Sequence, residues 1–344
     1  MAWKTGIGHS LSYTEETSWG TQASGADHYL DPRGGMETLI GTVEVIKPES
    51  LTSRGYDSSQ FTEGNHHVSG NITHDLRFGG GWLLFASQLA GRTVTTAGVS
   101  APYTHTLRLG GAVDTVVPAR GITVVVDREG ERAVAASKAV VFTGIRPTSV
   151  AFDFQQNAIA TASWEVVGKD STLVTRPTAT LPTADYIKSP SAASSPTAVV
   201  KFGTDGSETE YTTVTSVQLN VEQPLASRFH VGSAAQAHPV QEGYTTITGS
   251  FDIEHQDTGS SSFGAFGDAY RAQTINSLII TFDGGTDDQL EFDMAKVLIT
   301  STADQHIDGS GLQTTTIEFE AAYATNSVCT LKLTNAEAVA HVAG

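Results

Sequence analysis

The sequence predicts a mainly β protein: two tandem antiparallel β-barrel or sandwich domains, each with one short flanking α-helix. Three observations predict this class. Gly, Ser, Thr and Val are frequent among the 344 residues, and these residues favour strands and turns. Apolar and polar residues alternate in short runs, as they do in half-buried strands. The order of these runs in the first half of the chain recurs in the second half.

The first half begins with residues 1–40, which are rich in Gly, Ser and Thr and are predicted to form an extended N-terminal arm. A first β domain is expected over residues 41–170, where regular alternation starts at Leu39–Val45. Its further strands are predicted at Gly64–Asp75, Tyr103–Leu109, Ile122–Asp127, Ala135–Thr143, Ser149–Phe154 and Ile159–Val167. Short strands at this spacing are typical of an antiparallel barrel or sandwich.

Each half of the chain contains one segment with helical rather than strand periodicity. Apolar residues at i, i+3, i+4 and i+7 form one face of a helix. The first half has this spacing at Trp82, Phe85, Ala86 and Leu89. The second half repeats it at Phe263, Phe266, Gly267 and Tyr270. Gly91 follows the first set, where a glycine in the left-handed conformation can end a helix.

A Pro- and Ser-rich stretch at residues 171–200 separates the halves and is predicted as a linker. Residues 201–335 are predicted as the second β domain, and residues 336–344 as a C-terminal tail. The matched segments of the two domains are Pro48–Arg54 with Pro224–Arg228, Val68–Thr73 with Ile247–Asp252, Ile122–Asp127 with Leu278–Asp283, Ser137–Thr143 with Ala295–Ser301, and Ala160–Val166 with Thr314–Phe319. Together with the helices, these matches in one order indicate a duplicated module of ordinary domain size.

The two halves differ in charge. Residues 1–190 hold 15 Lys and Arg against 18 Asp and Glu, whereas residues 191–344 hold 5 against 19, which accounts for the net charge of −17. An acidic surface repels phosphate, so tight nucleic-acid binding by the second half is not expected. Acidity that serves only solubility is an equally good interpretation.

The single cysteine, Cys329, excludes an intrachain disulfide and a cysteine-based zinc site. The sequence shows neither a signal-peptide pattern nor an apolar run of membrane-spanning length, so we expect a soluble protein.

Two clusters of polar residues were considered as metal sites. His66, His67 and His74, with Asp75, lie in one predicted strand, but neighbouring strand residues point to opposite faces. Polar loop histidines are therefore the better interpretation. The second cluster is Asp287, Asp288, Glu291 and Asp293. It lacks the spacing of a calcium loop and favours an acidic hairpin turn. The sequence predicts no metal and no cofactor.

Candidate catalytic groups are equally few. Glu165 and Glu318 occupy matching strand positions and could form an acid pair only if the two domains faced each other. Cys329 has no histidine nearby in the sequence. Gly79–Gly81 could cradle an anion before the first helix, but no lysine follows, and a glycine hinge is the simpler interpretation. No catalytic residue is predicted.

Taken in order, these segments resemble the tail tube (major tail) proteins of long-tailed, siphovirus-like bacteriophages, in particular those that fuse two tube domains in one chain. The segments that carry the resemblance are Val68–Ile72, Trp82–Ala90, Tyr103–Leu107, Ser137–Phe142 with Ala151 and Phe152, and Thr161–Gly168. The resemblance extends over about residues 40 to 335 and rests on order, not on a single diagnostic motif.

The resemblance implies a structural virion protein, not an enzyme, assembled in the host bacterial cytoplasm and located in the phage tail. Tube domains of this family form helically stacked rings around a typically acidic channel, the conduit for genome ejection, through which double-stranded DNA passes without specific binding. Three two-domain chains would fill one pseudo-sixfold homotrimeric ring. Further implied partners are the tape-measure, tail terminator and distal tail proteins, with no membrane. A non-contractile tail is favoured.

The resemblance also implies contacts between rings. The segments expected to reach adjacent rings are residues 1–40, the long polar loops Thr52–His67 and Ala226–Tyr244, and roughly residues 325–344. Loops longer than a hairpin needs usually have a function.

Two alternatives stay open at the level of sequence. One is another phage virion β-sandwich protein, such as a head-decoration, baseplate or adhesin module. A receptor binder would present clustered exposed aromatic residues, and the candidates Tyr56, Phe61, Phe229 and Tyr244 are scattered over two loops. The remote alternative is a β-sandwich glycoside hydrolase that uses Glu165 and Glu318.

Overall fold

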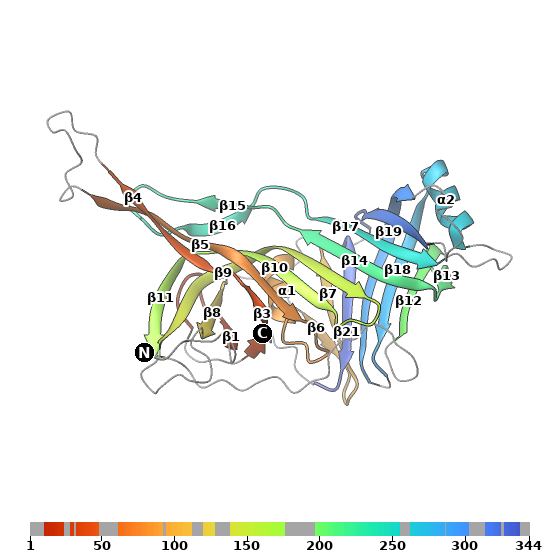
Figure 1. Ribbon diagram of the computed structural model, residues 1–344, viewed down its shortest axis with the longest axis horizontal. Coiled ribbons are helices and arrows are strands. Elements are labelled where there is room, and N and C mark those ends of the chain that lie inside the picture. Colours follow the sequence, from red (N-terminus) through yellow and green to blue (C-terminus); the bar gives the residue numbers. More distant parts are fainter. Residues whose placement is uncertain are drawn as a thin grey trace.

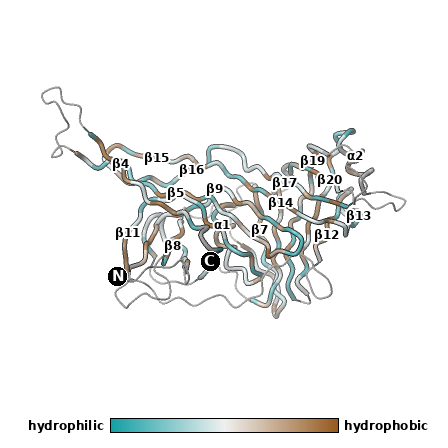
Figure 2. The backbone as a smooth tube through the Cα atoms, in the orientation of Figure 1, coloured by the Kyte–Doolittle hydropathy of each residue, from teal (hydrophilic) through white to brown (hydrophobic). Residues whose placement is uncertain are grey.

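The computed structural model describes residues 10–23, 28–30, 32–47, 61–91, 94–111, 120–127, 138–175, 197–254, 262–285, 287–302, 314–324 and 327–337. Strands make up most of these residues, and they pair into large antiparallel sheets (Figure 1). The prediction of a mainly β protein with two short helices is confirmed. Along the strands, hydrophobic and hydrophilic positions alternate, which is visible as changes of colour along the tube in Figure 2.

The elements of the first half and of the second half follow one another in a matching order. The first half contains β1 (Ser10–Glu15), β2 (His28–Leu30), β3 (Pro32–Glu37), β4 (Ile40–Ile46), β5 (Thr62–Asp75), α1 (Leu83–Ala90), β6 (Thr95–Ala97), β7 (Tyr103–Leu109), β8 (Ile122–Asp127), β9 (Lys138–Gln155), β10 (Thr161–Gly168) and β11 (Asp170–Thr175). The second half contains β12 (Thr197–Thr204), β13 (Ser207–Tyr211), β14 (Val214–Glu222), β15 (Leu225–Arg228), β16 (Ala237–Gln241), β17 (Thr246–Glu254), α2 (Ser262–Ala272), β18 (Ile275–Asp283), β19 (Gln289–Thr302), β20 (Thr314–Ala321) and β21 (Cys329–Asn335).

The strand pairing repeats with the element order. In the first half β1 pairs with β2 and β8, β9 with β8, β10 and β11, and β5 with β4 and β10. In the second half β12 pairs with β13 and β18, β19 with β18, β20 and β21, and β17 with β14 and β20. Each half therefore forms the same module, and the duplication inferred from the sequence is present in the strand topology.

The pairing register tests the individual sequence matches. Gly70 lies opposite Val166, and Gly249 lies opposite Phe319, so Val68–Thr73 and Ile247–Asp252 are equivalent, as predicted. The match of Ser137–Thr143 with Ala295–Ser301 is wrong. Phe142 lies opposite Val124 beside a bulge, and Met294 lies opposite Leu278 beside the corresponding bulge, so the equivalent of Phe142 is Met294. The match of Ile122–Asp127 with Leu278–Asp283 is also wrong, by two residues, because Val124 is equivalent to Leu278. A run of small and β-branched residues fits several registers, because only the partner strand selects one of them.

The two predicted strands Ala135–Thr143 and Ser149–Phe154 form one long strand, β9. Its first part pairs with β8 and β11, and its second part pairs with β10 and β14. Gly144, with φ +66°, and a bulge near Thr148 lie where the strand changes partners. Bulges and glycines of this kind let a strand turn from one sheet into another.

Part of the predicted N-terminal arm lies inside the first module. β1 pairs with β8, and the side chains of Leu11 and Tyr13 are buried. Both ends of the predicted linker also form strands, β11 and β12, while residues 176–196 and 338–344 lie outside the described residues. The arm and linker boundaries drawn from composition therefore do not coincide with those of the strands.

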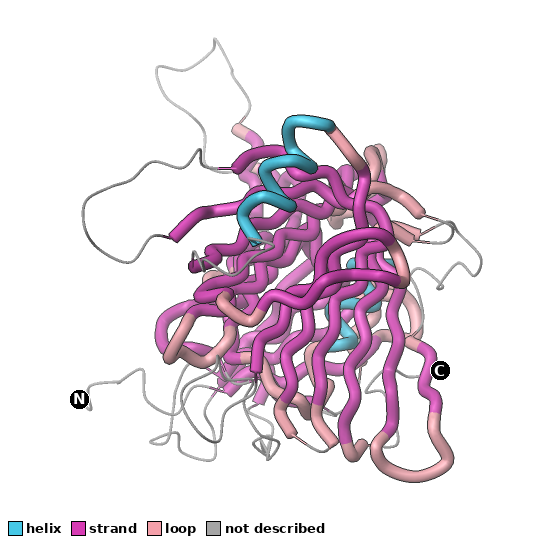
Figure 3. The backbone as a smooth tube through the Cα atoms, turned by 90° about the vertical axis from the view of Figure 1, so that its right-hand side faces the viewer, coloured by secondary structure: helices cyan, strands magenta, loops and turns pink. Residues whose placement is uncertain are grey.

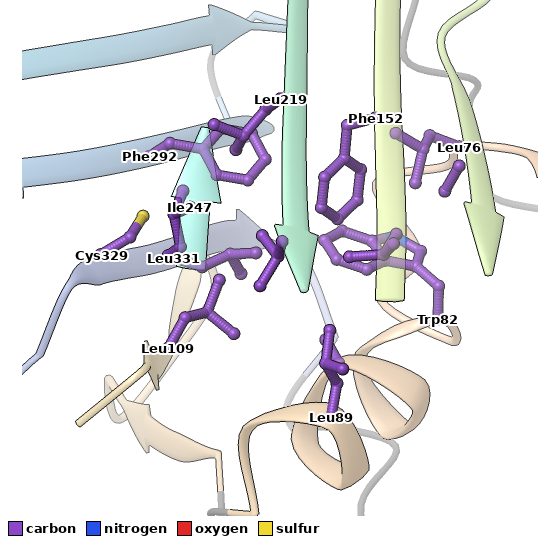
Figure 4. Packing of buried hydrophobic residues seen from close by; sticks show 14 of the residues in the cluster. Leu76, Trp82, Leu89, Leu109, Phe152, Leu219, Ile247, Phe292, Cys329 and Leu331 are labelled. Atoms are coloured by element: carbon purple, nitrogen blue, oxygen red, sulfur yellow. The ribbon is translucent and has the colours of Figure 1, made fainter. Parts of the chain in front are cut away.

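The two modules share one hydrophobic core. Phe152 and Phe292 approach with ring centroids 5.3 Å apart, and Phe154 stacks on Phe282 at 3.8 Å. Figure 4 shows side chains from both modules meeting here, with Phe152 and Trp82 on one side and Leu219, Ile247 and Phe292 on the other. Aromatic pairs stabilise such a junction beyond the area that they bury.

Two strand pairs also join the modules. β9 pairs with β14, from Ser149 opposite Glu222 to Gln155 opposite Ser216, so the sheets of the two modules continue into each other. β7, which the sequence order assigned to the first domain, pairs with β21 of the second module and carries β6 with it. The second module has no room for a counterpart of β7, because α2 ends at Ala272 and β18 begins at Ile275.

The helices hold equivalent places but differ in burial. α1 is enclosed, with every residue from Leu83 to Leu89 buried, and Gly91 ends it at φ +61° as predicted. α2 lies at the outer end of the second module (Figures 1 and 3) and buries Phe266 against Phe202, Tyr211 and Phe251. The predicted face is wrong for Tyr270, which is 38% exposed.

Candidate assembly surfaces

One face of the joined sheet is polar across both modules. Side chains alternate along β10, the second part of β9, β14, β17 and β20, so that every second residue points away from the core. The outward positions include Asp153, Glu165, Glu222, Asp252, Glu254, Glu318 and Glu320. These five segments carry no lysine or arginine at outward positions. The charged side chains at these outward positions are therefore all carboxylates, set among neutral polar residues.

The carboxylates of this face contact neutral donors. Asp252 accepts hydrogen bonds from Ser216 and Thr316, each at 2.6 Å, and Glu165 accepts one from Ser149 at 3.3 Å. A hollow in the face crosses the module junction, lined by residues such as Asp153, Gln218, Asn220, Ser250 and Glu318. Hydroxyl and amide groups orient the acids without neutralising them, so the face keeps its negative potential.

β4 and β5 extend beyond the body of the first module as a two-stranded arm (Figure 1). All seven residues of β4 are exposed, and they include Ile40 at 61% and Val45 at 55%. Among the described residues β5 is the only strand that pairs with β4. An unpaired apolar strand edge of this kind is a template for another strand.

The equivalent connection of the second module folds back. Predicted loop Ala226–Tyr244 contains the hairpin of β15 and β16, which lies beside the arm in Figure 1. His66 of β5 accepts from Gln236 at 3.1 Å and donates to Ala234 at 2.7 Å, both through the backbone. In predicted loop Thr52–His67, residues 52–60 lie outside the described residues, and Thr62–His67 belong to β5.

Arg146 anchors this hairpin to the first module. Its guanidinium donates to the carbonyl of Gln88 at 3.2 Å and to Nε2 of His238 in β16 at 3.2 Å. Burial lowers the pKa of Arg146. Burial, together with the charges of Arg146 and Arg228, lowers the pKa of His238 to about 4. The imidazole is therefore neutral at pH 7 and acts as an acceptor for Arg146.

The histidines considered as metal ligands do not converge. His74 is buried, where its Nε2 accepts from the indole of Trp164 at 2.9 Å. His66 lies 3.7 Å from Glu63, and the ring of His67 lies 6.4 Å from that of Phe229. These residues serve the core and the hairpin contact, respectively.

The other candidates also have structural surroundings. Asp287 and Asp288 lie in the turn between β18 and β19, as predicted for an acidic hairpin. Glu291 and Asp293 bind Lys332 at 2.7 and 3.3 Å. Burial raises the pKa of Cys329, which lies at the start of β21. Gly80, at φ +64°, provides the bend before α1.

Glu165 and Glu318 lie on the same acidic face but are not a pair. β9, β14 and β17 separate their strands, and four strand spacings amount to about 19 Å along the sheet. Paired glycosidase carboxylates lie about 5 to 9.5 Å apart. The arrangement in this chain does not form the acid pair that a hydrolase requires.

Sequence reasoning missed the acidic face and the junction of β9 with β14. The alternation that places Glu165, Glu318 and Glu320 outward is visible in the sequence. The joining of five segments into one sheet depends on pairing between strands far apart in the chain, which no local pattern reports.

The fold and these surfaces define a class: a duplicated β protein with an open apolar strand edge and an acidic sheet face. The model of the phage tail tube protein family matches residues 6–321, and the chain belongs to this family. No curated protein matches the sequence. Within the part of the chain that the structure describes, neither helix has the length and apolar character needed to cross a bilayer.

Proposed function

We propose that this chain is the repeating subunit of a tail tube in which three copies form each ring and the acidic face lines the channel. Membership of the phage tail tube protein family supports a structural, self-assembling tail component. The observation that carries the finer proposal is the acidic face itself, because it spans both modules and lacks outward lysine and arginine along its five segments.

The charge of this face suits a conduit for double-stranded DNA. DNA carries about one negative charge per 1.7 Å of axis, and basic side chains that neutralise phosphates hold it tightly. Carboxylates repel phosphates over about 8 Å at physiological ionic strength. A wall that carries Glu165, Glu222, Glu318 and Glu320 without cations lets the genome pass without specific binding.

The duplication supports the proposed three copies per ring. The two modules share their strand pairing, and the β9–β14 pair already joins them side by side. A ring with six module positions then needs three chains, related by a threefold axis with pseudo-sixfold module symmetry. The rings stack into a helical tube within the virion tail, assembled in the host bacterial cytoplasm, with the outer end of the β4–β5 arm directed at a neighbouring ring.

The further partners are proposed on the same basis. A tape-measure protein occupies the channel during assembly, and the tail terminator and distal tail proteins cap the two ends of a siphovirus-like, non-contractile tube. None of these roles needs a catalytic group. A head-decoration, baseplate or adhesin module would place its binding surface elsewhere than on a cation-free face that crosses both modules.

Negative-stain electron microscopy of purified protein tests the assembly. We expect rings or tubes with threefold averages and a central channel. Protein that stays monomeric at high concentration over a range of salt concentrations would contradict the proposal.

The lining is tested by charge reversal at the two matched positions. The double variant Glu165→Lys/Glu318→Lys should still form tubes, but these should bind double-stranded DNA with an affinity that falls steeply with salt. The matched control is the double variant Asp268→Lys/Asp205→Lys. It makes the same change of charge on α2 and beside β12, away from the acidic face. Equal DNA binding by both double variants would show that the acidic face does not line the channel.

A further inference from the structure

The junction of β9 with β14 within the chain provides a template for the contact between chains. We propose that β19 of one copy pairs with β4 of the next copy, in the register of that internal junction. This inference rests on the proposed self-assembly and specifies its partner as a second copy of this chain. The strands concerned are the equivalents, in the other module, of the two strands that already pair.

The acceptor edge is identified through β5 and β17. Val68 and Ile247 are equivalent positions of the two modules. Gly41 of β4 lies opposite Val68, and Val221 of β14 lies opposite Ile247. Gly41 therefore takes the place of Val221. The edge of β14 at this position is bound by β9, so the corresponding edge of β4 has the same geometry for a partner strand.

The donor edge is identified through β10 and β20. Ser149 of β9 lies opposite Glu165, and Ser301 of β19 lies opposite Glu318. Both strands skip one residue immediately before, in a bulge at Thr148 and at Thr300. Ser301 therefore takes the place of Ser149. A bulge repeated in both modules is a specific feature that re-aims the strand edge.

The internal register then fixes the pairs between copies. Within the chain Glu222 lies opposite Ser149, and the next pair is Val221 with Val150. The same register between copies pairs Thr42 of one copy with Ser301 of the next, and Gly41 with Thr302. Within the chain, the amide of Gln223 donates to the carbonyl of Thr148 at 2.8 Å. Between copies, the equivalent hydrogen bond runs from the amide of Val43 to the carbonyl of Thr300.

Both edges are open where the pairing requires it. In the described part of β19, Ser301 and Thr302 pair with β20 on one side, and no described strand pairs with the other side. β4 likewise has only β5 among the described residues, and Val43 is 50% exposed. Main-chain hydrogen bonds of an added strand provide affinity at such edges.

The two edges lie at opposite ends of the molecule. β4 is at one end of the view in Figure 1, and β19 belongs to the module at the other end. One donor and one acceptor edge per copy give a heterologous, head-to-tail contact, which generates a ring when the rotation closes. Because the internal junction sets the same rotation between modules, repetition of that junction continues the sheet from copy to copy.

A pair of cysteines tests the register. In the double variant Thr42→Cys/Ser301→Cys, directly opposite residues would lie about 4.5 to 5.5 Å apart between Cα atoms, which is within the range of a disulfide. Oxidation should produce covalent dimers and closed trimers on non-reducing gels. The native Cys329 is buried and free in the structure, so the wild type is the background control.

The chain itself supplies the matched control. The double variant Ser149→Cys/Glu222→Cys places cysteines at the equivalent pair within one chain, so oxidation should give only cross-linked monomers. Single variants Thr42→Cys and Ser301→Cys, mixed before oxidation, should give one heterodimer. Threefold rings under the microscope without a Thr42–Ser301 cross-link would overturn the register and leave the proposed function standing. Absence of both rings and cross-links would overturn both.

A measurement on the wild type covers the case in which a variant fails to fold. Amide hydrogen exchange in Gly41–Val43 should slow about tenfold between dispersed subunits and tubes, because an added strand protects the amides on the outer edge of β4. The β15–β16 hairpin, which is already docked within the chain, is the internal reference, and its exchange should not change on assembly. Exchange in β4 that does not change on assembly would contradict pairing at this edge.

Discussion

The β4–β5 arm and the β15–β16 hairpin belong to equivalent connections of the two modules, yet one projects from the body and the other folds back onto it. The difference lies in the partners. The segment between β15 and β16 binds the backbone of His66 through Ala234 and Gln236, and β16 places His238 beside Arg146. Among the described residues β4 has only β5 as a strand partner. The duplicated strands set the common sheet, and the contacts with His66 and Arg146 hold the second connection against the body.

The modules also differ at their edges. β7 of the first module adds to β21, which is equivalent to β11. A second pair of this kind cannot form between copies, because α2 runs almost directly into β18. The internal junction therefore has two strand pairs and a shared aromatic core, whereas the junction inferred between copies has one. Tubes should therefore dissociate into folded chains before the modules separate.

Gly70 and Gly249 are matched positions of the two modules, and their substitution should disrupt the sheet and have the largest effect on stability. A Cβ at Gly249 would lie 2.5 Å from the ring of Phe319 and 2.6 Å from the carbonyl of Gln218. At Gly70 it would lie 2.5 Å from the carbonyl of Thr38, and φ there is +149°. Overpacking costs about 1 to 3 kcal/mol, and a strained backbone adds about 1 to 3 kcal/mol.

We therefore expect Gly70→Ala to lower the free energy of unfolding by more than Gly249→Ala, with both losses above about 1 kcal/mol. Urea denaturation of dispersed subunits measures both. A larger loss for Gly249→Ala would contradict this ranking, because it would mean that the ring of Phe319 moves less easily than the backbone beside Gly70.

Lowering the pH should weaken the docking of the β15–β16 hairpin, with a smaller effect on the free energy of unfolding. The folded pKa of His238, about 4, lies below its ordinary value of 6.5. This stabilisation is complete above pH 6.5 and is lost as pH falls towards 4, because the unfolded chain binds the proton first. His238 is only partly buried, so solvent screening limits the effect to about 1 kcal/mol.

His238→Gln keeps an acceptor for Arg146 but cannot titrate, so the wild type should lose more stability than this variant between pH 7.5 and 4.5. His230→Gln, at an exposed position of the same connection, is the control and should match the wild type. Parallel pH profiles for the wild type and His238→Gln would contradict a neutral His238 in the docked hairpin.

The smallest effect sharpens the contrast between the helices. Gly267 lies inside α2, and a Cβ there would approach no atom closer than 3.6 Å, the guanidinium of Arg271. Gly267→Ala should therefore raise the free energy of unfolding by about 0.5 to 1 kcal/mol through helix propensity and reduced freedom of the unfolded chain. Thermal unfolding followed by circular dichroism measures the gain, and a loss would show that α2 packs more tightly at this position.

The sequence indicated local features well. The limits of Tyr103–Leu109 and Ile122–Asp127 coincide with β7 and β8, and Gly91 ends α1 as expected. These features depend on side-chain alternation, helical spacing and glycine geometry, all of which act over a few residues. The match of Ser137–Thr143 failed because strand texture does not specify a partner.

The duplicated order, the excess of acid in the second half and the absence of a recognisable catalytic motif could be derived from the sequence alone, since they are properties of composition and spacing. Tertiary structure decided the rest. It placed β7 in the other module, joined β9 to β14, and brought Glu165 and Glu318 onto one face about 19 Å apart. Hydrogen bonds between strands far apart in the chain determine which strands become neighbours. Among the described residues, this pairing leaves β4 with β5 as its strand partner and with one open edge.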